Sequence, residues 1–266
     1  MQVGTASKMA GLDVPAAVDG GRRAACVARC EKKWRALCRS LHVGDKDAAT
    51  WFGVIRDEYE GPARFYHTLE HVDALLRLAE REAIHDAEAV ALAIFFHDVV
   101  YDAKNGGGGA NERESAAVFR EFAEKHVTEV ALSRARRDAV SDWIVATATH
   151  RGDAVDADGK IFLDLDMSIL AADRATYLRY AANVRREYGH VNGVAWRVGR
   201  ARFLQSTLAA GAPVFASPRW APKEAAARRN ARAERDALVL DLCLGAGAAF
   251  AAAGAAAAAL YHRASS

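Results

Sequence analysis

The stretch AVALAIFFHD, residues 89–98, decides the fold and poses the chemical question of this sequence. Its first eight residues are apolar on every face of a helix, which is typical of a central helix covered on all sides. The stretch ends in His97 and Asp98, two adjacent groups that each bind a proton or a metal. Burying such a pair costs free energy unless hydrogen bonds or a cation compensate. The sequence therefore predicts a buried helix whose end needs polar partners from elsewhere in the chain.

Helical periodicity dominates the chain around this stretch. Apolar residues recur at i, i+3, i+4 and i+7 in WRALCRSLHV (34–43) and HVDALLRLAE (71–80). Further amphipathic helices are predicted at residues 111–126, 136–150, 175–188, 199–210 and 224–240. Only KIFLDLDM (160–167) favours extended structure, and it is short. The expected fold class is all-α, a helical bundle with a central buried metal site.

The chain divides into three predicted parts. Residues 1–29 lack periodicity and indicate a loose N-terminal extension, residues 30–240 form the helical domain, and residues 241–266 form an Ala-rich tail. Within the tail, Leu242–Leu260 carries no charge over nineteen residues, which is the length of a membrane span. Eleven of these residues are alanine and three are glycine, so the driving force for insertion is weak. A low-complexity tail and a C-terminal membrane anchor both stay open.

The composition excludes several classes of protein. A net charge of +2 over 266 residues, with no long basic face, gives no reason to expect nucleic-acid binding. The four cysteines, Cys26, Cys30, Cys38 and Cys243, form no C-x-x-C pair and no ligand-like cluster, so we expect reduced thiols. No apolar secretory signal opens the sequence. We expect an intracellular, cytoplasmic protein, tethered to a membrane only if the tail inserts. The sequence does not indicate an oligomeric state.

Two other segments offer partners for His97 and Asp98. His71 lies on a predicted helix, four residues after His67, so the two imidazoles share one helix face. The stretch FLDLDMSIL places Asp164 and Asp166 among apolar residues, where an unpaired carboxylate is unfavourable. Imidazole and carboxylate ligands together suit Mn, Fe, Co, Ni or Zn more than Ca. These residues therefore predict a site for a divalent cation.

A peptidase is an alternative interpretation of the first segment. His67-Thr68-Leu69-Glu70-His71 fits H-x-x-E-H, in which both histidines bind zinc and Glu70 activates water. So short a pattern occurs often by chance. It also leaves His97 and Asp98 without a role, which makes it the weaker hypothesis.

The sequence resembles the HD-domain superfamily of metal-dependent phosphohydrolases and, more narrowly, a branch of predicted HD phosphohydrolases. That superfamily takes its name from an adjacent His-Asp pair with an upstream histidine and a downstream aspartate. The matching stretches follow the expected order from about Trp34 to Leu238. They are RFYHTLEHV, AIFFHDVVYD, NERESA, IVATATH, FLDLDMSILA, REYGHV, Gly199-Arg200 and ARRNARAE. An ordered set of this kind is far more specific than the His-Asp dipeptide alone.

The resemblance implies a role for each matching residue. His71, His97, Asp98 and Asp166 become the metal ligands, with Asp166 preferred over Asp164 because the family's ligand begins a helix after a short apolar run. His67 resembles a histidine that protonates the leaving oxygen in distantly related cyclic-nucleotide phosphodiesterases. We expect Arg64 to contact the phosphoryl oxygens, with Arg113 and Arg151 as weaker candidates.

The residues that match the superfamily give weaker support to a second metal ion. The position where two-metal relatives carry extra histidines holds Asn111 and Glu112, so one tight divalent metal is favoured, with Mg a further option. Glu112 and His150 are candidates to position water or hold a second ion, and Asp164 to contact the substrate or support the ligands. Asp102 and Asn111 complete this group, and Asn111 is equally a candidate helix N-cap, with Glu114 in the capping-box position.

The function implied by the resemblance is hydrolysis of a phosphoester or phosphoanhydride of a small molecule, with a metal-bound water as nucleophile. A nucleotide is the favoured substrate. A non-catalytic module that binds metal and nucleotide is the second hypothesis, and the H-x-x-E-H zinc peptidase is the third. Retention of His67 beside the predicted metal ligands favours the enzyme over the binding module.

Overall fold

The buried helix predicted from residues 89–98 is α4, Ala87–Phe96, and α3, α5, α6 and α7 pack around it. The computed structural model describes residues 20–209 and 211–264, with side chains given only as far as residue 245 in the last helix. The remaining helices are α1 Gly20–Ser40, α2 Asp45–Tyr59, α3 Leu69–Ala79, α5 Ala110–His126, α6 Arg134–Ala146, α7 Ala157–Met167, α8 Arg174–Glu187, α9 Gly193–Thr207 and α10 Glu224–Ala264. Short 3₁₀ turns are η1 Gly107–Gly109, η2 Gly152–Ala154, η3 Ser168–Ala171 and η4 Pro218–Lys223. No β-strand occurs within the described ranges, and the all-α fold class is confirmed.

Other helices cover every face of α4, so the apolar residues on all of its faces are removed from water. Its apolar residues from Val90 to Phe96 are buried, apart from the partly buried Ala91. Its N-terminus is closed by Asp86, whose side chain accepts a hydrogen bond from the Ala89 N–H and forms an ion pair with Arg136 of α6. The helix therefore has a fixed start, and its C-terminal end presents His97 and Asp98 at a defined place.

Aromatic rings join α4 to the helices at one end of the bundle. Trp34 of α1 packs edge-on against Phe95 and Phe96, and its ring also contacts Phe122 of α5. The Trp34 indole Nε1–H donates a hydrogen bond of 2.8 Å to the carbonyl of Ala48 in α2. One side chain thus holds four helices together.

Four features differ from the sequence-based expectation. The stretch 160–167, expected to be extended, lies in helix α7, which begins after Asp156 caps it through the Gly159 N–H. The loose extension predicted through residue 29 is wrong for residues 20–29, which belong to α1; residues 1–19 lie outside the described residues. Helix α2 was not predicted. The N-cap of α5 is Gly109 rather than Asn111, which lies inside the helix.

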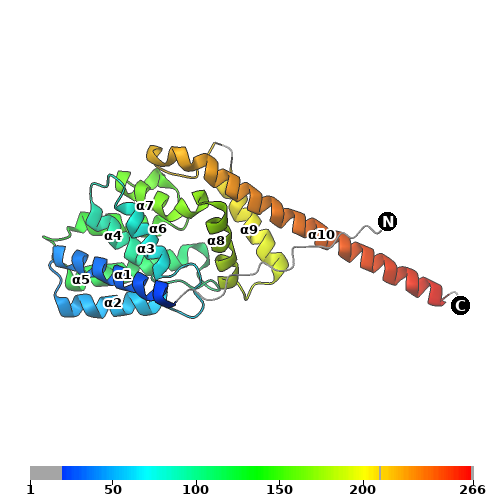
Figure 1. Ribbon diagram of the computed structural model, residues 1–266, viewed down its shortest axis with the longest axis horizontal. Coiled ribbons are helices and arrows are strands. Elements are labelled where there is room, and N and C mark those ends of the chain that lie inside the picture. Colours follow the sequence, from blue (N-terminus) through cyan, green and yellow to red (C-terminus); the bar gives the residue numbers. More distant parts are fainter. Residues whose placement is uncertain (1–19, 210, 265–266) are drawn as a thin grey trace.

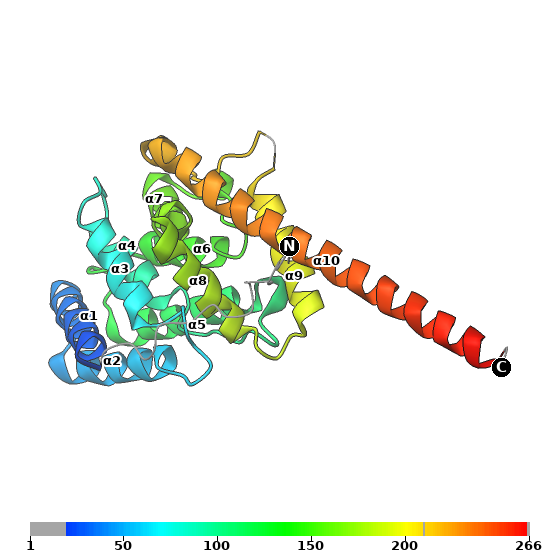
Figure 2. The same cartoon turned by 45° about the vertical axis from the view of Figure 1, so that its right-hand side comes forward.

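The long helix α10 begins on the body of the bundle and runs away from it. Its first part packs against α9 and η3, and its C-terminal part projects beyond the other helices (Figures 1 and 2). The helix is continuous across residue 241, where a separate tail was expected to begin. In the part of the chain with described side chains, no helix has the length and apolar character needed to span a membrane. The candidate anchor Leu242–Leu260 lies largely outside that part.

Replacing Trp34 with alanine should lower the free energy of unfolding by about 3–5 kcal/mol, because a buried indole is lost and a cavity remains. Denaturant unfolding followed by circular dichroism measures the change. Val130→Ala is the control, because Val130 is 98% exposed, and it should stay within about 0.5 kcal/mol of the parent protein. A Trp34→Ala protein as stable as the control would contradict this account of the core.

Candidate metal centre and adjoining cavity

The ends of three helices bring the four predicted metal ligands together. His71 lies in the first turn of α3, which begins after Thr68 caps the helix through the Glu70 N–H. His97 and Asp98 follow the last residue of α4, and Asp166 lies in the last turn of α7. Because α3 and α7 both pack on α4, His71 and Asp166, 95 residues apart in sequence, meet at one point.

The donor atoms of these residues face one another at short range. His71 Nε2 lies 3.2 Å from His97 Nε2 and 3.0 Å from Asp166 Oδ1. His97 Nε2 lies 3.0 Å from Asp98 Oδ2 and 3.6 Å from Asp166 Oδ1. His97 Nδ1 lies 3.0 Å from the carbonyl oxygen of Ile94, so a proton on Nδ1 donates to that oxygen and leaves the Nε2 lone pair facing the cluster.

The donor set fits a divalent cation. Ligand atoms of His71, His97 and Asp98 all lie within 4.8 Å of one another, and Asp166 Oδ1 lies within 3.6 Å of both imidazoles; so many lone pairs at close range are unfavourable without a positive charge. Imidazole and carboxylate ligands suit first-row transition metals and zinc. The side chains of His71, His97, Asp98 and Asp166 are therefore able to hold such an ion.

The pKa values of these groups reflect the same crowding. Burial alone would lower the pKa of His97, but the charges of Asp98 and Asp166 outweigh burial and raise it well above its usual range. Burial would raise the pKa of Asp166, yet hydrogen bonds from His150, His71 and His97 hold it well below its usual range. Without a cation, the cluster therefore keeps a proton that a metal ion must displace.

His150 extends the cluster towards solvent. Its Nε2 lies 2.8 Å from the second carboxylate oxygen of Asp166, Oδ2, and so fixes that carboxylate from the side opposite His71. The His150 backbone has a φ of 52°, in the left-handed region that is strained for a residue other than glycine. The turn that follows α6 thus adopts a costly conformation that places this imidazole beside Asp166.

Glu187, at the end of α8, organises the segment that carries His67. Its Oε1 accepts hydrogen bonds from the backbone N–H groups of Phe65, Tyr66 and His67. Its Oε2 lies 2.7 Å from His67 Nδ1 and accepts a hydrogen bond from the Tyr101 hydroxyl. Burial would raise the pKa of Glu187, but the bonds and charge from His67 lower it to about 2. The carboxylate is therefore charged and holds the His67 ring by one nitrogen.

A cavity of about 570 Å³ adjoins the cluster. Asp98, Asp166, His67 and His150 line it on the side of the cluster. Six aromatic side chains also line it, from α8 and its C-cap, from α9, and from the segments before α3 and after α4. We define the aromatic wall as Tyr66, Tyr101, Tyr180, Tyr188, Trp196 and Phe203. The volume lies in the range of small-molecule sites, which are mostly apolar with a few convergent polar groups.

Glu112 also lines the cavity. Its Oε2 is buried without a hydrogen-bond partner among the described protein atoms. A buried carboxylate oxygen of this kind needs a donor from water, an ion or a bound molecule. Glu112 is thus placed to contact a bound molecule or its water, as its predicted role requires.

Arg64 does not face the cavity as its predicted role requires. Its Nη1 donates to the carbonyl oxygens of His67 and Asp98, and its Nη2 donates to that of Val99 at 2.7 Å. The guanidinium also stacks on the rings of Tyr59 and Tyr101. Arg64 therefore ties the His67 segment to the end of α4, and this geometry does not support a contact with phosphoryl oxygens.

Three further predicted residues lie away from the cluster. Asp164, on the other side of α7, accepts hydrogen bonds from the Ser217 N–H and hydroxyl and from the Ala216 N–H. The side chain of Asn111, in the first turn of α5, bonds to the backbone of Asp102, which lies in an exposed loop. Neither group lines the cavity.

The H-x-x-E-H arrangement is not formed. His67 precedes α3, so it does not share a helix face with His71, and its Nδ1 is bonded to Glu187 instead. Glu70 is not among the residues that line the cavity, and its buried Oε1 has no partner among the described atoms. This geometry gives no support to the peptidase hypothesis.

Two residues of the site were not predicted. Glu187 belongs to REYGHV and Arg200 to Gly199-Arg200, two of the matching stretches to which no role was given. Glu187 follows two arginines on an amphipathic helix, where a carboxylate is typical of a solvated face. Their sequence gives no sign of burial, because the partners lie on distant helices.

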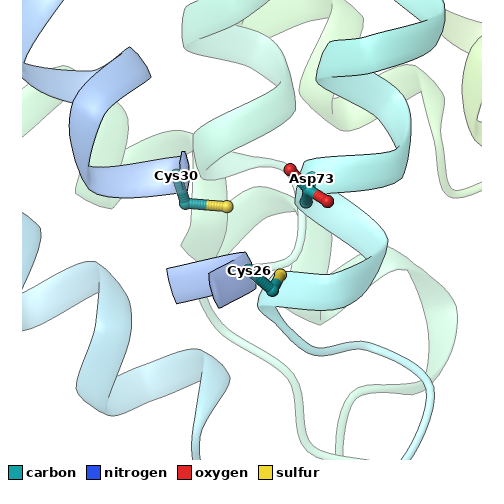
Figure 3. A group of neighbouring side chains, drawn as sticks. All are labelled: Cys26, Cys30 and Asp73. Carbon is teal, nitrogen blue, oxygen red and sulfur yellow. The ribbon is translucent and has the colours of Figure 1, made fainter. Parts of the chain in front are cut away.

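A second group of donors lies between α1 and α3. Cys26, Cys30 and Asp73 point towards one another (Figure 3), and one ligand atom from each lies within 4.8 Å of the others. This corrects the expectation that the cysteines form no ligand-like cluster. Both thiols donate to the carbonyl of Leu69, and Asp73 forms a two-bond ion pair with Arg29. The group joins α1 to the turn of α3 that carries His71.

Metal affinity should fall steeply as the pH is lowered, because the cation must displace the proton that His97 holds. The fall should be about tenfold per pH unit for each proton displaced. Titration calorimetry with Mn²⁺ on metal-depleted protein, at about pH 8 and about pH 6, measures the difference. Asp102→Asn should bind as the parent does and His97→Ala should not bind. Equal affinity at the two pH values would contradict the assignment.

Glu187→Gln should lower the free energy of unfolding by about 1–3 kcal/mol, because one buried acceptor is replaced by an amide NH₂ that faces other donors. It should also lower the pKa of His67, which Glu187 and Asp98 raise against the effect of burial. NMR titration of the His67 ring and denaturant unfolding measure the two effects. Glu124→Gln, at an exposed position of α5, is the control. An unchanged His67 pKa would show that the pair does not act as described.

Comparison with known proteins identifies no relative of this chain. No family model, no curated protein and no solved structure matches the chain. The case for the site rests on its own geometry, and the resemblance noted in the sequence motifs stays a prediction.

Proposed function

We propose that this chain is a metal-dependent phosphohydrolase of the HD-domain superfamily, acting on a small phosphorylated molecule of the nucleotide type. One observation carries the proposal. His71, His97 and Asp98, a group that could hold a divalent cation, lie with the adjoining Asp166 carboxylate at the side of a cavity of about 570 Å³, and the His67 imidazole also lines that cavity. Metal ligands next to a cavity and a positioned acid–base group are the parts that such hydrolysis needs.

The cation would be held by His71, His97, Asp98 and Asp166. When bound, it supplies a water of lowered pKa and a positive charge that polarises a phosphoryl oxygen. The fixed donors of α3, α4 and α7 determine where that charge lies, and the His150 imidazole keeps the Asp166 carboxylate in place. The buried helix ends around the cluster limit access of bulk water, which strengthens these interactions.

His67 is the candidate general acid. Its Nδ1 is bonded to the charged Glu187 carboxylate, which leaves the other ring nitrogen for the substrate. The same carboxylate orients the ring and favours its protonated form, because a negative charge beside one ring nitrogen stabilises the imidazolium. A proton from His67 would go to the leaving oxygen as the bond between phosphorus and that oxygen breaks.

The pair of His67 and Glu187 favours an enzyme over a binding module. A protein that only holds a metal and a nucleotide needs the ligands and the cavity. It has no need of a buried carboxylate that both orients and charges an imidazole beside them. Turnover separates the two hypotheses directly.

Phosphate release from a panel of nucleotides and sugar phosphates, with Mn²⁺, Co²⁺, Ni²⁺, Zn²⁺ or Mg²⁺ added, tests the proposal. Asp98→Asn should reduce metal-dependent release by at least about 100-fold, because a ligand of the cation is lost. The control Asp102→Asn changes an aspartate four residues away that lies outside the cavity, and it should retain activity. Glu70→Gln should also retain activity, which the peptidase hypothesis forbids. No release by folded, metal-loaded protein would favour the binding module.

A further inference from the structure

The charge of the cavity restricts the substrates that it accepts. Three carboxylates line it, those of Asp98, Glu112 and Asp166. Among the described residues that line the cavity, Arg200 is the only arginine, and there is no lysine. Apart from a bound cation and the two imidazoles, the positive charge available to a substrate therefore depends on Arg200.

The charge of Arg200 is already used. Its side chain is 7% exposed, and its Nε and Nη2 donate to the two carboxylate oxygens of Glu234 on α10, at 2.8 and 3.1 Å. Its Nη1 donates to the Tyr180 hydroxyl, and its plane lies over the rings of Tyr180 and Phe203. A two-bond ion pair cancels most of the field that the guanidinium would otherwise offer to an anion.

Three other arginines near the cavity donate to backbone carbonyls. Arg185 donates to the carbonyl oxygens of Tyr188 and Val191, and Arg64 donates to three carbonyls at the end of α4. Arg113 donates to the carbonyl of Gly108. These bonds tie the three side chains to the loops that frame the cavity.

A phosphomonoester brings a charge of about −1.5 to −2 near neutral pH, which one divalent cation balances. Each additional phosphoryl group adds negative charge, and sites for di- and triphosphates supply further lysines, arginines or metal ions to meet it. Here the extra charge would face carboxylates, and pairs of like charge are unfavourable. The charges therefore favour a single phosphoryl group.

The aromatic wall gives the rest of the substrate its character. Tyr66 and Tyr180 pack edge to face with ring centroids 4.6 Å apart, and Tyr188 packs against Trp196 at 5.1 Å. Exposed faces and edges of such rings bind flat, uncharged groups by stacking and offer no charge to pair with. The part of the substrate beyond the phosphorus should accordingly be flat and neutral.

We propose that the site selects phosphate monoesters with a flat, uncharged leaving group, of the nucleoside monophosphate kind, and discriminates against di- and triphosphates. This inference rests on the proposed hydrolase function. The reaction adds water to phosphorus and breaks the bond to the ester oxygen, which receives a proton. Its products are a nucleoside and inorganic phosphate, and it needs no other reactant.

Initial rates of phosphate release by the full chain from AMP, ADP, ATP and ribose 5-phosphate test the inference, with free Mn²⁺ held constant. The value of kcat/KM should be at least about tenfold higher for AMP than for ADP, and lower again for ATP. Trp196→Ala should raise KM for AMP by about tenfold, because a stacking surface is lost, and should leave ribose 5-phosphate nearly unaffected.

Gly199 offers a matched pair of variants. It lies on α9 in the wall of the cavity, and a Cβ there would meet no described atom within 4 Å. Gly199→Lys adds a cation and should lower the ratio of kcat/KM for AMP to kcat/KM for ATP by about tenfold. The neutral Gly199→Gln should leave this ratio unchanged. The pair separates the effect of charge from that of bulk.

The possible outcomes test the substrate preference separately from the proposed hydrolase function. Release from ADP or ATP at least as efficient as from AMP would overturn the inference and leave a phosphohydrolase standing. Equal narrowing by Gly199→Lys and Gly199→Gln would overturn the charge argument in the same way. No release from any of the four compounds by folded, metal-loaded protein would overturn the proposed function and the inference together.

Discussion

Repulsion between lone pairs is the constraint on which the centre of this molecule depends. Two imidazole nitrogens lie 3.2 Å apart, with the carboxylates of Asp98 and Asp166 about the same distance away. Left bare, such an arrangement would open, so it persists only with a proton or a cation inside it and rigid helices around it. The apolar helix α4 and its aromatic neighbours supply that rigidity, because close-packed cores resist the small shifts that would relieve the repulsion.

Charged side chains away from the cluster serve the same constraint. Arg136 pairs with Asp86 at the start of α4, and Arg64 binds carbonyls at its end, so both ends of the central helix are held. Asp164 turns from the same helix as Asp166 towards the backbone of residues 216 and 217. Two neighbouring aspartates thus share one helix but face different neighbours: Asp166 faces the candidate metal centre, and Asp164 faces the segment just before η4.

Much of the fold could be predicted because it follows local patterns. The periodicity of residues 71–80 and the all-round apolar character of residues 89–96 correspond to helices in the structure. Residues 160–167 could not be assigned correctly, since a short apolar run fits a strand as well as a buried helix. The convergence of His71, His97, Asp98 and Asp166 followed from motif order. The roles of Arg64 and Glu187 depend on backbone groups of distant segments, which residue type and spacing do not reveal.

The bonds made by Glu187 bear on how such a chain diverges over time. Its three backbone partners, the N–H groups of residues 65–67, are present whatever side chains those positions carry, proline excepted. Substitutions at Phe65 and Tyr66 therefore leave the bonds intact, while no substitution there can restore an acceptor lost at position 187. Compensation for these bonds is one-sided: they do not depend on which side chains stand at positions 65 and 66, and they do depend on the glutamate 120 positions away.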